Sequence, residues 1–209
     1  MAVPGFGATL CDVSGNIVAN CGFENGTNSS TIDGNTNNSV PVSWTPNAAY
    51  DSQTGFNNLR SSPVNSGFLA LSIGNTDAEP VPSLSQTLTD VAGATYSGSL
   101  FVDYGGAGQG DTSSAVFFDT LINGVAVQSL NSSAPGVCIQ YFFSFIGTGS
   151  DVLTLEGNTS PSEWLVDDIV VTESSGPPVV GTTPEPSSIA LFGTGILGIA
   201  GVVRKRLAA

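Results

Sequence analysis

The residues of this chain best suited to chemistry are carboxylates, and two of them, Asp167 and Asp168, are adjacent in an apolar run at 164–172. Because neighbouring side chains of a strand point to opposite faces, we expect one of these carboxylates to face the interior. A buried carboxylate is costly unless it is paired or metal-bound, and Arg60 is the only basic residue before position 204. Oxygen ligands of this kind suit Ca²⁺. The alternative is that both aspartates lie half-exposed at a strand end and accept backbone N–H groups.

Histidine is absent from the chain. Its absence removes the commonest general base, the Ser-His and Cys-His nucleophile pairs, and imidazole metal ligands. Two carboxylates such as Asp111 and Asp119 can in principle hydrolyse a glycosidic bond, but nothing in their sequence surroundings sets one of them up as the acid. The sequence therefore predicts a protein that is not an enzyme.

The chain has three cysteines, Cys11, Cys21 and Cys138. Cys11 and Cys21 are ten residues apart, and in an exported protein they could close a short loop as a disulfide. Cys138 begins an apolar run and is expected to be buried as a small hydrophobic residue. None of the three belongs to a C-x-x-C pair, so neither a zinc site nor a redox dithiol is predicted.

The overall composition is acidic and rich in small polar residues. Seventeen acidic residues outnumber four basic ones, and the formal net charge is −13. Such a chain repels nucleic acid and anionic lipid surfaces, so neither is an expected partner. Charged residues are only 10% of the chain, and it contains 26 glycines. This composition is typical of extracellular β-domains and poor for helices.

The elements that must position these residues are short strands. Several alternate clearly; Leu84, Gln86 and Leu88, for example, share one face. Asn123 and Gly124 between two of the runs predict a tight hairpin. Short strands between turn-forming residues predict an all-β jelly-roll β-sandwich over 16–173, after an N-terminal segment at 1–15. The predicted strands are 16–20, 40–45, 67–73, 83–89, 94–102, 115–122, 125–130, 138–147, 151–156 and 164–172.

The sequence changes character after residue 173. Four prolines in 174–188 predict an extended linker. The uncharged run at 189–203 would form a helix of about 22 Å, short of the roughly 30 Å hydrocarbon core, so a buried core helix is the alternative. Its four glycines and the basic cluster that follows favour a short transmembrane helix at 189–203 with a basic cytoplasmic tail at 204–209. That basic cluster is Arg204, Lys205 and Arg206.

The C-terminal motif supports a sorting function. Pro184, Glu185 and Pro186, followed by one apolar span and a basic terminus, resemble the PEP-CTERM sorting tail of exported bacterial proteins. The resemblance implies transient anchoring in the inner membrane of a Gram-negative bacterium, processing by the membrane protease exosortase, and a final place at the cell surface or outside the cell. Members of that family normally begin with a signal peptide, which residues 1–10 do not resemble. Either the start of the gene that encodes the signal peptide is missing or trimmed, or the sorting tail alone does not establish that the protein is exported.

The body has a second resemblance. The segment 16–24, Trp44 and the run at 164–171 are similar to the frame of galactose-binding-like jelly rolls, including carbohydrate-binding modules, and the strands around 84–88 and 93–100 fit as well. In that family the first and last strands lie side by side, and a structural calcium often lies between them. The resemblance implies Glu24 with Asp168 or Asp167 as calcium ligands.

The same resemblance implies that sugars stack on exposed aromatic side chains. Tyr104 precedes a glycine-rich loop at 105–110 that would form a rim, whereas core packing is the favoured alternative for both tryptophans. Two functions remain open: a non-enzymatic protein of the envelope or extracellular matrix, and a calcium-stabilised protein that recognises an extracellular polysaccharide. The aromatic candidates are Trp44, Tyr50, Phe56, Tyr104 and Trp164.

Overall fold

The structure is a computed structural model of the whole chain. It describes residues 9–27, 39–52, 57–61, 64–74, 80–104, 116–131, 137–159 and 163–174. The chain divides into two units, residues 1–174 and 175–209. The predicted linker from 175, helix and basic tail lie outside the described residues, and so do Phe56 and the loop at 105–110. In the described part of the chain, no helix is both long and apolar enough to cross a membrane.

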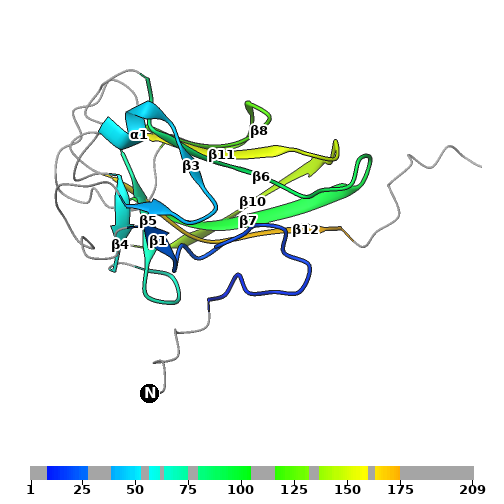
Figure 1. The fold of residues 1–209 in the computed structure, drawn as a ribbon, viewed down its shortest axis with the longest axis horizontal. Coiled ribbons are helices and arrows are strands. Elements are labelled where there is room, and N and C mark those ends of the chain that lie inside the picture. Colours follow the sequence, from blue (N-terminus) through cyan, green and yellow to red (C-terminus); the bar gives the residue numbers. More distant parts are fainter. Residues whose placement is uncertain are drawn as a thin grey trace, which may run out of the picture. The chain divides into compact units, whose positions relative to one another are not determined.

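Two five-stranded antiparallel sheets, both made of described residues, lie face to face (Figure 1). We call them the β7 sheet and the β11 sheet. The β7 sheet has the order β10 (Ile139–Ile146), β7 (Thr95–Tyr104), β12 (Trp164–Glu173), β5 (Ala70–Ile73), β4 (Asn58–Arg60). The β11 sheet has the order β3 (Thr45–Pro46), β6 (Ser83–Thr87), β11 (Val152–Asn158), β8 (Phe117–Ile122), β9 (Val125–Leu130). This arrangement confirms the predicted all-β jelly-roll sandwich.

The hydrophobic core lies between the two sheets because long strands such as β7 and β10 alternate and turn one face inward. Tyr96, Leu100 and Val102 of β7 are buried, as are Leu84 and Leu155 of the opposing sheet. Burying each such side chain contributes about 1.5–3 kcal/mol relative to leaving it in water. Three minor elements complete the described part of the domain: β1 (Gly26–Thr27) pairs with β2 (Val40–Pro41), and α1 (Ala48–Ser52) follows β3.

The predicted hairpin between β8 and β9 is confirmed. Asn123 and Gly124 have φ angles of 51° and 77°, as a two-residue type I′ turn requires. The Asn123 side chain donates to the buried carboxylate of Asp151, which also accepts from Thr148. Burial acts to raise the pKa of Asp151, but these hydrogen bonds outweigh it and lower the pKa from its ordinary value. The hairpin is thereby tied to the turn between β10 and β11.

Two predicted strands are wrong or incomplete. Residues 16–20 form a loop rather than a strand, because Asn20 and Phe23 have positive φ and the chain touches β12 at only a few points. Figure 1 shows this N-terminal segment, in blue, running beside β12. The predicted strand at 40–45 is interrupted by a turn in which Ser43 has a φ of 73°, so it splits into β2 and β3.

Candidate functional site

A β-bulge in β12 decides where the paired aspartates point. The register between β12 and β7 shifts between Asp167 and Val170, and Asp168 has a φ of 49°. Both aspartates are buried, at 2% and 1% exposure. The expectation that they face opposite sides of the sheet is therefore wrong, because the bulge breaks the alternation. The alternative is wrong in its half-exposure, since both side chains are buried, but right in that Asp167 accepts backbone N–H groups.

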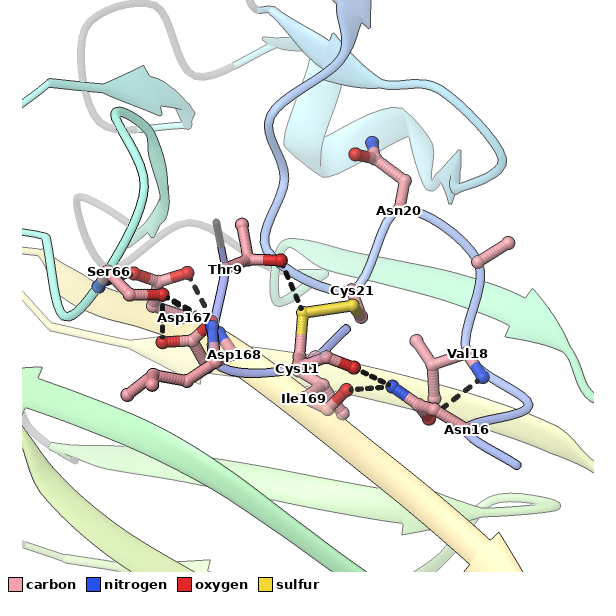
Figure 2. Close-up of a disulfide and its surroundings, with 12 residues drawn as sticks. Thr9, Cys11, Asn16, Val18, Asn20, Cys21, Ser66, Asp167, Asp168 and Ile169 are labelled. Atoms are coloured by element: carbon pink, nitrogen blue, oxygen red, sulfur yellow. Dashed lines mark hydrogen bonds between the residues drawn. A yellow bond between two sulfur atoms is a disulfide. The ribbon is translucent and has the colours of Figure 1, made fainter. Parts of the chain in front are cut away.

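Both carboxylates reach the same two residues of the loop before β5. Asp167 Oδ2 accepts the backbone N–H groups of Asn65 and Ser66, at 2.9 and 3.1 Å. Asp168 accepts from the Asn65 side-chain amide and from the Ser66 hydroxyl, each at 2.7 Å. The Ser66 hydroxyl in turn accepts from the N–H of Leu10, at 2.9 Å. Figure 2 shows this convergence of the loop and the strand.

The negative charge of this pair has no cationic neighbour among the described residues. Within those residues Arg60 is the basic side chain, and it forms a salt bridge with Glu163 at 3.4 Å. Burial, and after it the charge of Asp168, raises the pKa of Asp167 to about 7, against the lowering effect of its hydrogen bonds with Ser66 and Asn65. A bound cation would remove this penalty because it would compensate both charges.

Glu24, which belongs to the N-terminal segment, contacts the continuation of the same loop. Its Oε1 accepts the backbone N–H groups of Phe68 and Leu69, at 2.8 and 3.0 Å. Its Oε2 is buried, and no described residue donates to it. At Gly67, whose φ is 68°, an added Cβ would lie 2.1 Å from Glu24 Oε1. A larger residue at position 67 would therefore displace the carboxylate.

The side chains of these residues have the oxygen atoms that a hard cation such as Ca²⁺ binds, but their positions do not form a complete coordination site. Oxygen ligands are the kind that Ca²⁺ takes, and the orphaned Glu24 Oε2 lacks a partner among the described residues. Within that part of the chain, however, the carboxylates of Glu24, Asp167 and Asp168 do not all come within 4.8 Å of one another. The structure brings the two aspartates together, whereas Glu24 contacts the loop further along, at Phe68 and Leu69.

The cysteines separate into a disulfide and a single thiol. Cys11 and Cys21 are joined by a disulfide. With Asp12 they form the compact group of potential metal ligands found among the described residues, but disulfide sulfurs are not thiolate ligands. Cys138 is half-buried rather than buried. Burial, followed by the charges of Asp103, Asp167 and Asp168, raises the pKa of its thiol.

Most of the predicted sugar-stacking aromatics are in the core. Tyr50 has 0% exposure and its hydroxyl donates to the Ser39 carbonyl, so its proposed role as an exposed stacking residue is wrong. Trp44 is also buried and packs on Phe23. Trp164 is buried as well, which agrees with the core-packing alternative. Tyr104 is half-buried, with its ring centroid 5.0 Å from that of Trp164.

The outer face of β10 carries an exposed aromatic residue that sequence reasoning did not select. Phe142 is 70% exposed, and Gln140, Ser144 and Ile146 are exposed beside it. Their partners on β7 are Phe101, Ser99, Ser97 and Thr95. We call these eight residues the β10 face. The alternation of 138–147 contained the signal, because the buried Phe143 and the half-buried Tyr141 and Phe145 leave Phe142 on the opposite side.

Comparison with known proteins identifies the C-terminal motif. Residues 182–206 match the model of the PEP-CTERM protein-sorting motif, which confirms the resemblance of Pro184, Glu185, Pro186 and the basic cluster. The chain therefore carries a C-terminal sorting signal. No curated protein matches the chain.

The body resembles several solved β-sandwiches. One is TmCBM61 in complex with β-1,4-galactotriose, at 15% identity and a TM-score of 0.49, covering 76% of this chain and 99% of that one. Another is the CBM22-1 xylan-binding domain of Paenibacillus barcinonensis Xyn10C, at 18% identity and 0.45, covering 75% and 93%. A cyclase from Fischerella sp. TAU is similar too, at 14% identity and 0.48, covering 75% and 96%. Such neighbours therefore include both carbohydrate-binding modules and an enzyme.

Proposed function

We propose that this chain is an exported, non-catalytic protein of the bacterial envelope or extracellular matrix whose jelly roll binds an extracellular polysaccharide. The sorting motif at 182–206 supports delivery to the outside of the cell. The Cys11–Cys21 disulfide suits an oxidising compartment. The observation that carries the binding proposal is the β10 face, where an exposed aromatic ring stands among hydroxyl and amide side chains.

The chemistry of the β10 face fits a neutral sugar. An exposed aromatic ring offers an apolar surface on which the C–H side of a pyranose can stack. Next to it, Gln140 and Ser99 carry hydrogen-bonding groups suited to sugar hydroxyls, and they are joined at 3.3 Å, which holds the Gln140 amide in place. The exposed residues of the face are uncharged, in a chain with a net charge of −13. Acidic polysaccharides would be repelled by the rest of the surface, so a neutral glycan is the expected ligand.

Replacing Phe142 with alanine is expected to weaken polysaccharide binding about tenfold or more, the usual effect of removing an aromatic anchor. The measurement is affinity electrophoresis of the wild type and variant against a panel of neutral polysaccharides. Val125→Ala is the matched control, because Val125 is equally exposed on the other sheet.

Equal mobility shifts for wild type and Phe142→Ala would show that the β10 face is not the binding site. If the wild type is retarded by none of the neutral polysaccharides, the carbohydrate-binding proposal itself is wrong. Phe142→Ala should leave the melting temperature nearly unchanged, since the side chain is exposed.

For sorting, we propose that exosortase is the processing partner and that the run at 189–203 anchors the protein in the inner membrane until cleavage near Pro184–Pro186. The basic cluster at 204–206 would remain in the cytoplasm. Intact mass spectrometry of the protein from its bacterial host should show a loss of residues from the C-terminus. A Pro184→Ala, Pro186→Ala double variant should keep the full tail, and a wild-type protein that also keeps it would rule out processing.

We also propose Ca²⁺ as a structural ion held by Asp167, Asp168 and Glu24. Support comes from two adjacent buried carboxylates without a described cationic neighbour, and from the orphaned Oε2 of Glu24. Calcium would supply positive charge and oxygen coordination at this place, while the loop at 65–69 holds the three side chains. The ion would thus stabilise the fold rather than take part in a reaction.

A further inference from the structure

The loop closed by the disulfide packs directly against the bulge that carries Asp168. We call residues 9–24 the disulfide loop. The N–H of Ile169, the residue after the bulged aspartate, donates to the carbonyl of Cys21 at 3.0 Å. Two residues further along β12, the carbonyl of Val171 accepts the N–H of Ile17 at 2.9 Å. Backbone groups of β12 beyond the bulge are thus satisfied by the disulfide loop.

Asn16 ties the loop to the strand with its whole side chain. Its Nδ2 donates to the carbonyls of Cys11 and Ile169, each at 2.9 Å. Its Oδ1 accepts from the N–H groups of Val18, at 3.2 Å, and Val171, at 2.8 Å. Two donors and two acceptor positions are all that an asparagine side chain offers. In Figure 2 the dashed lines from Cys11 and Ile169 meet at the Asn16 side chain.

A second connection reaches the carboxylate itself. The N–H of Leu10, next to Cys11, donates to the Ser66 hydroxyl, and that hydroxyl donates to Asp168. The start of the disulfide loop therefore orients the donor that orients the carboxylate. Its other end leads to Glu24, three residues after Cys21. Both ends of the disulfide loop thus lead to the proposed cation ligands.

We propose that the Cys11–Cys21 disulfide strengthens cation binding, because it orders the segments that position Asp168 and Glu24 for the cation in the oxidised protein. This inference rests on the calcium site proposed above and concerns how that site is regulated. A positive φ is uncommon for a residue other than glycine, although aspartate adopts it more readily than most, and the neighbours of the bulge help to hold it. Those neighbours are Asn16 and Cys21, and the disulfide fixes the loop that carries them.

Reduction would release the two ends of the disulfide loop from each other. The loop would then regain conformational freedom, and ordering it again would oppose cation binding. Groups that orient ligands from outside the coordination sphere typically change metal affinity by about 10–100-fold. The cation would consequently bind most tightly where disulfides form, which for an exported protein is outside the cytoplasm.

The test is calorimetric titration of Ca²⁺ into the oxidised wild type and into a Cys11→Ser, Cys21→Ser double variant. We expect the dissociation constant to rise about tenfold or more in the double variant. Val13→Ser is the matched control, because Val13 is an exposed member of the same loop and its hydrogen bonds to Cys11 and Asn16 use backbone groups, which the substitution keeps. Its affinity should equal that of the wild type.

The outcomes separate the two proposals. If titration of Ca²⁺ into the oxidised wild type gives no heat of binding, the calcium site itself is overturned. Equal affinity in wild type and double variant leaves the calcium site in place and overturns its dependence on the disulfide. If the double variant shows no cooperative melting without calcium, Asn16→Ala decides instead, because it keeps the disulfide and removes the tie to β12. An unchanged calcium affinity in Asn16→Ala then overturns the inference.

Discussion

Saturating calcium is expected to raise the melting temperature of the metal-free protein by about 8 °C. A ligand at 100 times its dissociation constant stabilises the native state by about 2.7 kcal/mol, and each kcal/mol shifts the melting temperature by about 2–4 °C in a domain of this size. The physical source is compensation of the buried charges of Asp167 and Asp168. Differential scanning calorimetry in calcium and in EDTA measures the shift.

Variants at the site and away from it make this test specific. Asp168→Asn should abolish most of the calcium-induced shift, because it removes one of the two adjacent charges. Glu173→Gln is the matched control, since Glu173 is an exposed carboxylate at the end of the same strand. Identical melting temperatures of the wild type in calcium and in EDTA would sink the calcium proposal.

Replacing Trp164 with alanine is expected to lower the free energy of unfolding by about 3–5 kcal/mol, the usual cost of truncating a buried tryptophan. Its side chain has 0% exposure, and its ring centroid lies 5.0 Å from that of Tyr104 and 6.0 Å from that of Phe118. The loss would leave a cavity between the two sheets, beside Tyr104 of β7 and Phe118 of β8. Urea denaturation followed by circular dichroism measures the change in stability.

Phe142→Ala is the comparison for this core substitution. Because Phe142 is exposed, its loss should change the free energy of unfolding by no more than about 0.5 kcal/mol. A small effect at Trp164 would contradict its place in the core and reopen its candidacy as a sugar-stacking residue. A large effect at Phe142 would mean that its ring is packed in the native state.

The strands could be predicted where the pattern is local. Leu84, Gln86 and Leu88 are buried on one face as expected, and Asn123-Gly124 forms the expected turn. The prediction failed at 16–20, where the apolar residues resemble a strand but a disulfide and two positive φ angles impose a loop. Tyr50 was misplaced because an aromatic ring with a polar tip suits either a surface or a satisfied core position, and only its contact with Ser39 distinguishes them.

The all-β class, the sorting motif at 182–206 and the lack of histidine chemistry follow from the amino-acid sequence, because they depend on composition and on the local order of residues. That Asp167 and Asp168 point the same way is a consequence of the folded arrangement. The bulge that turns Asp168 is held by Asn16 and Cys21, and the contact between Asn16 and Ile169 spans 153 residues. No local period encodes such a contact, so the orientation of these carboxylates emerges only when the first and last segments of the domain meet.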